Sequence, residues 1–286
     1  MDTDEIEVGI VNLPDDWWQY ATTCQALSEL FIQHLLSLFL SVEINGQTQH
    51  GVYTGFLFYY REHLLWVTAG HVIDEIRYIL SAPNASIAGM RWLDNCAIPG
   101  AESIPVHHRD MEMFSANESG IDFGVVKILG LDRANILRND QVKPMTEQVW
   151  KNVHLAQPEG YYVLGYPKEW GELSEKRISE NQVLCSFRAN LACLPVSRIE
   201  YRGADPTDEF WNDPEAFYGQ IMPFVDVPWH QPESVVGMSG GPLFSIERDI
   251  NRQIRYRLFG IQRSWRQDER IIRAEPIHRI IGIMTE

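Results

Sequence analysis

The chain has 286 residues, of which 45% are hydrophobic and 22% are charged, and its formal net charge is −15. A chain of this length can bury one large core or two smaller ones. The negative charge argues against nucleic acid as a main partner, because phosphate binding requires a basic surface. The first residues, MDTDEIEVG, are acidic, whereas a secretory signal begins with basic residues, so we expect a cytoplasmic protein.

Two further features bear on membranes and metals. The apolar stretch from Leu30 to Val42 is too short to span a membrane and is interrupted by Gln33 and His34, so we expect it in the core, with no membrane partner. The four cysteines show no CxxC or metal-ligand spacing, so we predict no metal site and no cofactor. Reduced thiols are favoured, and a disulfide between Cys185 and Cys193 is the alternative.

The predicted elements begin with one helix and continue as many short strands. Asp15 or Asp16 is placed to cap a helix that extends to Leu30, and we expect this helix to pack on the first of two β-rich halves. Asn45-Gly46 then predicts a hairpin. Later strand-like runs are VYTGFLFYY, HLLWVTAG, FGVVKIL, YYVLGY, NQVLCSF, GPLFSI, RYRLFGI and RIIRAEPI. Short strands separated by Gly, Pro and Asn are typical of a sandwich or barrel.

Two stretches interrupt this pattern. The polar region 132–152 predicts a boundary, which gives an N-terminal helical extension at 1–35, a first half at 36–145 and a second half at 146–286. The segment from Glu200 to Glu233 carries eight acidic residues, one basic residue and five prolines. It is interpreted either as a solvated surface loop or as a loop with a binding role.

The sharpest motif is GMSGGP, from Gly237 to Pro242. Glycines around Ser239 let the backbone turn tightly and bring main-chain N–H groups toward a reacting oxygen. A serine hydroxyl needs a histidine to take its proton, and that histidine needs an acid to fix its tautomer. His71 in TAGHV and Asp122 in GIDFGVVKI are the candidates. Each residue alone is equally well explained by packing or by a turn, but three such motifs in this order favour catalysis.

The serine motif also fits a second class of enzyme. Gly237 to Gly241 matches the GxSxG elbow of α/β-hydrolases, in which the acid and the histidine follow the serine. Only His278 follows Ser239 before the chain ends, and the remaining sequence is too short for the rest of such a sheet. The esterase interpretation is therefore the weaker alternative.

In the order His71, Asp122, Ser239, the chain resembles the chymotrypsin-like and trypsin-like serine peptidases, above all their bacterial members. The likeness extends from about Leu36 to Met284 and includes VYTGFLF, VLGYP, LFGIQRSW and EPIHRIIGIM. It implies an all-β fold of two six-stranded antiparallel β-barrels, with a short C-terminal helix near Pro276. The first barrel would carry His71 and Asp122, and the second would carry Ser239.

The resemblance also implies roles for individual residues. His71, Asp122 and Ser239 would be the catalytic triad of a serine endopeptidase, and the N–H groups of Gly237 and Ser239 would form the oxyanion hole. The implied substrate-binding residues are Glu233, Gln262, Arg263 and Ser264. Glu233 would favour cleavage after basic residues, whereas Arg263 on the cleft wall would favour acidic ones, and basic specificity is slightly preferred.

Two departures from the family pattern shape the expected regulation. Met238 stands where zymogen-activated members carry an acid, and Val72 where many secreted members carry a cysteine. We therefore expect neither activation by N-terminal cleavage nor a disulfide at the histidine loop. The expected partners are a protein or peptide substrate and a regulatory protein, in a role in bacterial stress or antiviral defence. The alternative is a catalytically silent module that binds a partner through the same cleft or through the acidic segment.

Overall fold

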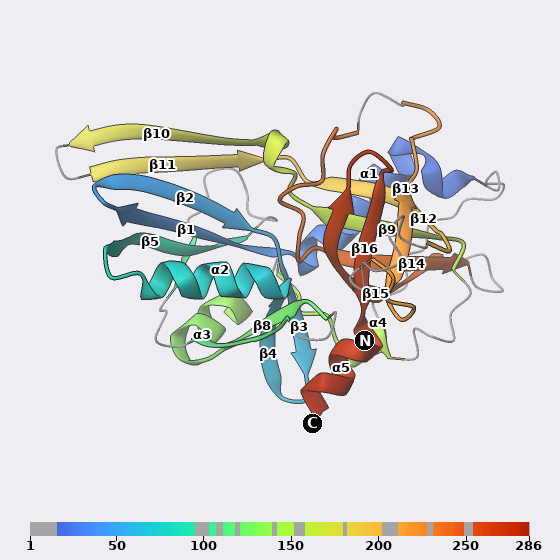
Figure 1. Cartoon of the computed structure of the whole chain (residues 1–286), viewed down its shortest axis with the longest axis horizontal. Coiled ribbons are helices and arrows are strands. Elements are labelled where there is room, and N and C mark those ends of the chain that lie inside the picture. The colour runs from blue at the N-terminus through green and yellow to red at the C-terminus, as the bar shows by residue number, and fades with distance from the viewer. Residues whose placement is uncertain are drawn as a thin grey trace.

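The computed structural model describes residues 16–94, 103–106, 111–117, 121–138, 142–151, 158–179, 182–201, 211–227, 231–248 and 254–285. Its strands form two halves that lie next to each other, with helices at their surfaces (Figure 1). The strands of the first half come from residues 36–128, and the barrel strands of the second half come from residues 160–276.

The first half is built from two antiparallel sheets of four strands, with the orders β2-β1-β5-β6 and β3-β4-β8-β7. Its strands are β1 (Leu36–Ile44), β2 (Gln47–Tyr53), β3 (Phe56–Tyr60), β4 (His63–Thr68), β5 (Ala85–Asp94), β6 (Ile104–Pro105), β7 (Met111–Ala116) and β8 (Phe123–Ile128). The β1–β2 hairpin turns at Asn45-Gly46, as the sequence predicts. One buried cluster, with Leu38, Trp66 and Ile73 among its members, joins both sheets to helix α2 (Gly70–Ser81).

The second half is a closed barrel of six antiparallel strands in the order β12-β13-β16-β15-β14-β9. Its strands are β9 (Gly160–Gly165), β12 (Ala192–Arg198), β13 (Phe217–Ile221), β14 (Pro242–Arg248), β15 (Ile254–Arg266) and β16 (Ile271–Pro276). Strands β10 (Gly171–Ser179) and β11 (Gln182–Ala189) form a separate hairpin that projects from the barrel (Figure 1). Helix α5 (Ile277–Thr285) follows Pro276 directly, as expected.

The predicted all-β architecture in two halves is confirmed, and the second half is the predicted six-stranded barrel. In the first half, the described strands form two sheets of four where a closed barrel of six was expected. The region of the predicted boundary contains helices α3 (Gly130–Arg138) and α4 (Glu147–Trp150). The division at residue 145 stays a prediction.

Helix α1 (Ala21–Phe31) packs on the second half, so the expectation that it packs on the first half is wrong. The ring of Phe31 stacks on that of Phe244 in β14, with the ring centroids 4.3 Å apart. The hydroxyl of Tyr162 in β9 donates a hydrogen bond to the carbonyl of Trp18, which precedes the helix. These aromatic contacts attach the helix to strands β9 and β14 of the second half.

The start of α1 is capped from a distant part of the chain. The backbone N–H of Ala21 donates to Oδ1 of Asp226 over 2.7 Å. Asp16 makes no capping hydrogen bond through its side chain, and Asp15 lies outside the described residues. The predicted local cap is therefore replaced by a carboxylate from the acidic segment.

The acidic segment is not simply a surface loop. Strand β13 lies within it and closes the barrel between β12 and β16, so the interpretation of 200–233 as a loop is wrong. Asp213 and Asp226 of the same segment are engaged in contacts with the rest of the protein. The strand has only five residues and follows many acidic residues and prolines, so the sequence pattern did not predict it.

Two smaller expectations concern thiols and membranes. Cys24 and Cys193 are buried and free, whereas Cys96 and the side chain of Cys185 lie outside what the structure describes. Across the described helices, none is long and apolar enough to span a membrane. The stretch from Leu30 to Val42 runs from the end of α1 through a short 3-10 helix (Ile32–His34) into β1, and most of its side chains are buried, as expected.

Candidate active site

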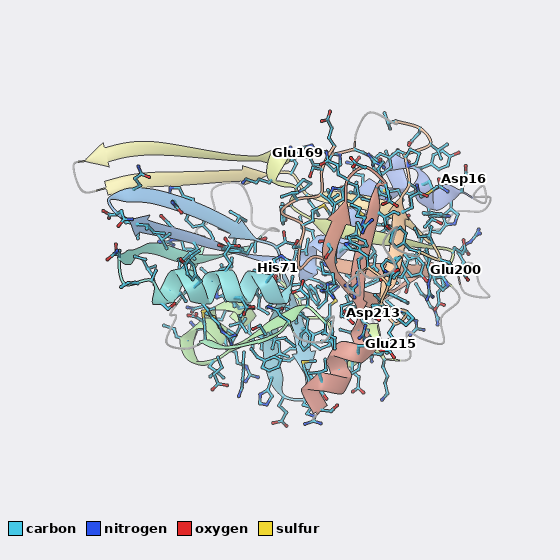
Figure 2. All side chains as sticks on the ribbon, in the orientation of Figure 1. Asp16, His71, Glu169, Glu200, Asp213 and Glu215 are labelled. Atoms are coloured by element: carbon cyan, nitrogen blue, oxygen red, sulfur yellow. The ribbon has the colours of Figure 1, made fainter. Side chains whose placement is uncertain are left out.

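His71 lies in the first turn of α2, directly after strand β4 ends at Thr68 (Figure 2). The helix was not predicted, although Val72, Ile73 and Ile76 repeat at helical spacing and are all buried. Gly70 precedes His71 at a point of close approach, where an added Cβ would lie 2.8 Å from Oδ1 of Asp122. The glycine therefore lets the start of the helix come close to that carboxylate.

Asp122 holds His71 through two hydrogen bonds. Its Oδ1 accepts the backbone N–H of His71 over 2.9 Å, and its Oδ2 lies 2.9 Å from Nδ1 of the ring. Asp122 stands immediately before strand β8 and is buried, whereas the side chain of His71 is 49% exposed. With Nδ1 turned to the carboxylate, the other ring nitrogen, Nε2, is left available to a reactant.

The electrostatics of this pair follow from its contacts. The hydrogen bond to Asp122 raises the pKa of His71 above its ordinary value, while burial and the charge of Arg263 act in the opposite direction. Burial acts to raise the pKa of Asp122, but the hydrogen bond and charge of His71, together with Arg263, lower it below its ordinary value. The carboxylate is therefore ionised at neutral pH.

Ser239 lies in a tight turn that leads into strand β14. Gly240 follows it with a φ of 90°, and an added Cβ there would collide with Oγ1 of Thr68 and the carbonyl of Thr54. The N–H of Gly240 donates to the carbonyl of Gln262 in β15 over 2.8 Å. The turn is thus fixed to the barrel on one side and pressed against the first half on the other.

The backbone around Ser239 leaves two donors available. Among the described residues, the N–H groups of Gly237 and Ser239 have no hydrogen-bond acceptor. The carbonyl of Gly237, by contrast, accepts the hydroxyl of Thr54 over 2.8 Å. The Gly237 N–H shares its peptide with the carbonyl of Val236, which accepts the N–H of Lys168. The Ser239 N–H shares its peptide with the carbonyl of Met238, which accepts the N–H of Gly241, so both donors are pre-oriented without being consumed.

His71 and Ser239 line one cavity of about 490 Å³. Its walls come from both halves and combine apolar with charged side chains. They include Phe39, Tyr53, Val72, Glu75, Lys168 and Val236. The cavity is therefore large enough for several side chains of a peptide. Among the described residues, no group of His, Cys, Asp and Glu is arranged to hold a metal ion.

The predicted substrate-binding residues lie elsewhere. Glu233 is exposed, and its backbone N–H donates to Oε1 of Glu169 over 2.7 Å. Gln262 is buried, and the carbonyl of Ser264 accepts its amide over 3.4 Å. Arg263 is also buried, because a bulge between Gln262 and Ser264 breaks the alternation of β15. Within the described chain, none of these four residues lines the cavity that holds His71 and Ser239.

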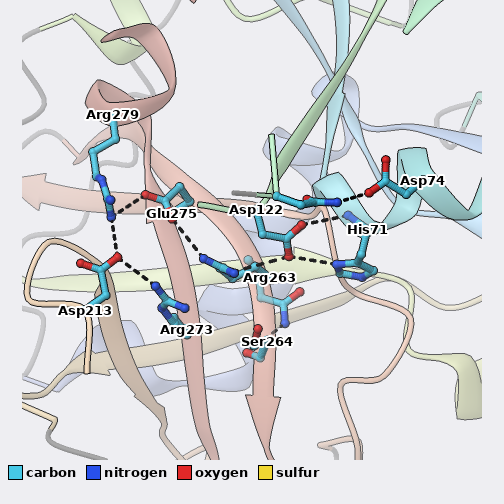
Figure 3. Close-up of polar contacts among 11 residues, drawn as sticks. His71, Asp74, Asp122, Asp213, Arg263, Ser264, Arg273, Glu275 and Arg279 are labelled. Atoms are coloured by element: carbon cyan, nitrogen blue, oxygen red, sulfur yellow. Dashed lines mark hydrogen bonds and ion pairs between the residues drawn. The ribbon is translucent and has the colours of Figure 1, made fainter. Parts of the chain in front are cut away.

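Arg263 instead approaches the Asp122 side chain from the barrel (Figure 3). Its Nε lies 3.6 Å from Oδ2 of Asp122, and its Nη1 lies 3.4 Å from Oε2 of Glu275. The sequence did not predict the roles of Glu275, which contacts Arg263, and Thr54, which contacts the turn before Ser239. A signal for Glu275 does exist, because Arg273 and Glu275 stand two residues apart in an otherwise apolar strand and so share one face.

The topology excludes the hydrolase alternative. Ser239 precedes β14, which pairs antiparallel with β9 and β15 in a closed barrel. In the α/β-hydrolase elbow, the serine stands on a sharp turn between a strand and the helix that follows it, in a mostly parallel sheet flanked by helices. The esterase alternative based on the GxSxG pattern is therefore wrong.

Comparison with known proteins gives similarity in structure only. No protein-family model and no curated protein matches the chain. The protease Anisep from Arthrobacter nicotinovorans is 12% identical, with a TM-score of 0.42 over 85% of this chain and 90% of that one. Kallikrein-related peptidase 10, in a complex with Zn²⁺, is 13% identical, with a TM-score of 0.46 over 88% and 93% of the two chains. A serine protease of a human pathogenic astrovirus is 13% identical, with a TM-score of 0.38 over 86% and 90%.

These values are too low to carry an argument about chemistry. The fold is defined by the chain's own strand order, in which a closed antiparallel barrel of six strands stands beside a second β-rich half. That order agrees with the chymotrypsin-like architecture expected from the motifs, and the chain is similar in structure to solved serine proteases.

Proposed function

We propose that the chain is a serine endopeptidase in which Ser239, His71 and Asp122 form the catalytic triad. The observation that carries this proposal is the doubly hydrogen-bonded pair of His71 and Asp122 in the same cavity as Ser239. A histidine fixed by a carboxylate beside an accessible serine is the arrangement that activates a serine nucleophile.

The proposed reaction proceeds in two steps. In the first, Ser239 Oγ attacks the carbonyl carbon of a peptide bond while Nε2 of His71 takes its proton. The same proton then passes to the leaving amine, and an acyl-enzyme remains. In the second step, His71 takes a proton from water, which attacks the ester carbonyl. His71 then returns this proton to Ser239 Oγ as the ester C–O bond breaks and the carboxylic acid product leaves. Asp122 fixes the tautomer of His71 throughout and stabilises its cation.

The proposed oxyanion hole consists of the N–H groups of Gly237 and Ser239. Its support is that neither donor has an acceptor among the described residues and that the peptides carrying them are held through the carbonyls of Val236 and Met238. Removing one such donor typically lowers turnover by about 10²–10³-fold. The proposed chemistry uses only groups of the chain itself.

The proposal extends to the substrate and the setting. A cavity lined by both halves, with apolar and charged walls, suits a protein or peptide substrate. We further propose a regulated cytoplasmic protease that depends on a regulatory protein partner, in bacterial stress or antiviral defence. The family resemblance of the three motifs is what supports this part.

The test is labelling of the purified protein with a fluorophosphonate probe. Wild type should be labelled, whereas Ser239→Ala and His71→Ala should not. Ser81→Ala is the matched control, because Ser81 is an exposed serine at the end of α2 and its variant should be labelled like wild type. Labelling that persists in Ser239→Ala, or its absence from folded wild type in the presence and absence of cell extract, would contradict the proposal.

A further inference from the structure

A chain of buried charges begins at Asp122 and continues into the second half, away from the cavity (Figure 3). Arg263 lies between Asp122 and Glu275, and the side chain of Glu275 is fully buried. Glu275 also contacts Arg279 of α5, with Oε1 2.8 Å from Nη1. The carboxylate of Asp213 then binds both Arg279 and Arg273, at 2.8 and 2.9 Å.

The signs of these charges alternate along the chain. Asp122 is negative, Arg263 is positive, and Glu275 is negative when it is ionised. The arginines and Asp213 continue the series. Burial lowers the pKa of Arg263 to about 10, so its guanidinium is still charged at neutral pH. Burial also raises the pKa of Glu275 to about 7, against the opposing effect of Arg279 and Arg263.

Burying these charged side chains in the barrel costs hydration free energy that apolar side chains would not lose. Replacing buried ion pairs by well-packed apolar residues is often neutral or stabilising, so stability alone gives weak support for keeping them. A strand residue at the position of Arg263 could be apolar and still pack against β14 and β16. With an apolar residue at position 263, Glu275 would lose one of its counter-charges, and the carboxylate that holds His71 would lose a fixed positive charge 3.6 Å away.

We propose that Arg263, held by Glu275, is an electrostatic positioning residue that keeps the Asp122 carboxylate ionised and limits the basicity of His71. The inference rests on the proposed function, in which His71 is the general base. Arg263 does not line the cavity, so it acts through its charge, on Asp122 at 3.6 Å and on His71 beyond it. Glu275 sets the strength of this effect, because its negative charge partly neutralises Arg263.

The sign of the effect follows from the groups that face His71. They are Asp122 before β8, Arg263 from β15 and Glu75 from its own helix. Asp122 and Glu75 favour the imidazolium, whereas Arg263 disfavours it. Removing the charge of Arg263 should therefore raise the pKa of His71. Removing the charge of Glu275 leaves Arg263 less neutralised and should lower it.

The test is an NMR titration of the His71 ring in the full chain with Ser239→Ala, so that no turnover is needed. In this background, Arg263→Gln should raise the pKa of His71 and Glu275→Gln should lower it, each by about 0.5–1 pH unit. Arg263→Lys keeps the charge and should leave the value within about 0.3 unit of the parent. A purely structural role would move all three variants in the same direction or not at all.

Two shifts of the same sign, or shifts of less than about 0.2 unit in both glutamine variants, would overturn the inference. If Arg263→Gln does not fold, Glu275→Gln decides alone, because its shape is conserved and only a downward shift supports the proposal. The proposed function is tested separately by labelling of Ser239. Opposite shifts without labelling would leave this inference standing and overturn the proposed function.

Discussion

Asp122 binds both the backbone and the ring of His71, so it orients the imidazole and anchors the first turn of α2. Asp122→Asn keeps the shape of this side chain and removes its charge. An amide that offers its NH₂ group to Nδ1 favours the wrong tautomer, so the rate of fluorophosphonate labelling should fall by about 10⁴-fold. The labelling rates of wild type and variant are compared at a high pH, where His71 is neutral in both proteins. An unchanged temperature of thermal unfolding is the control for folding.

The same variant tests the sign of the electrostatic effect. The neutral ring of His71 is the active base, and Asp122 raises its pKa above the ordinary value of 6.5. The labelling rate of wild type should therefore rise with pH through a midpoint above 6.5. In Asp122→Asn the midpoint should move downward, since the stabilised cation has lost its partner. An unchanged or higher midpoint would mean that Asp122 does not control His71.

The turn at Ser239 depends on a residue without a side chain. In Gly240→Ala the alanine would have to adopt a positive φ of 90°, which residues with a side chain rarely do, and its methyl group would collide with Oγ1 of Thr68. We expect a loss of at least about 2 kcal/mol in the free energy of unfolding, together with loss of labelling. Chemical denaturation and the probe measure the two effects.

Gly282 in α5 provides the matched control, because an added Cβ there meets nothing within 4 Å. Gly282→Ala should be neutral or should stabilise the protein by up to about 1 kcal/mol, as alanine is favoured in helices. Equal effects of the two substitutions would show that the Ser239 turn does not need its glycine.

At the scale of elements, helix α1 is fixed by a carboxylate that lies far away in the sequence. Asp226→Ala removes the acceptor for the N–H of Ala21 and should lower the free energy of unfolding by about 0.5–2 kcal/mol. Asp16→Ala is the control, because Asp16 makes no capping contact and its loss should change stability by less than about 0.5 kcal/mol. Urea titrations of both variants distinguish the distant cap from the local one, and a larger effect at Asp16 would refute this assignment.

Local signals predicted some elements well and others not at all. Asn45-Gly46 predicted its hairpin because the turn type is encoded by two adjacent residues. Helix α2 was not predicted although Val72, Ile73 and Ile76 mark its buried face, because β4 ends at Thr68 and the helix begins at Gly70, so the strand pattern leads directly into it. The place of α1 could not be predicted, since it depends on contacts between Phe31 and a strand more than two hundred residues away.

The candidate site shows the same division. The sequence motifs suffice to propose His71, Asp122 and Ser239, because each stands in a short pattern beside a strand. The position of Arg263 depends on a bulge in β15, which changes the face of every following residue, and no local pattern announces it. Arginine is also rarely buried unless it is paired with an acid. Burial of Arg263 could therefore be predicted only together with the position of its partner, Glu275.

At the scale of the whole molecule, the site is divided between the two halves. His71 and Asp122 belong to the first half, and the turn with Ser239 belongs to the second. Thr54, between β2 and β3, joins them, because its hydroxyl donates to the carbonyl of Gly237 and accepts the N–H of Tyr166 at 3.4 Å. This buried hydroxyl is therefore one of the contacts that set the relative position of histidine and serine.

Thr54→Val tests this connection, since valine has nearly the same shape and lacks the hydroxyl. The carbonyl of Gly237 would lose its donor in a buried site, so the free energy of unfolding should fall by about 1–3 kcal/mol. Labelling of Ser239 should fall with it, because the Gly237–Met238 peptide, which lies between the two proposed oxyanion donors, loses its contact with the first half. Thr54→Ser restores the hydroxyl and should recover both labelling and most of the stability. If valine and serine at this position behave alike in denaturation and labelling, the two halves are aligned by other contacts and Thr54 only fills space between them.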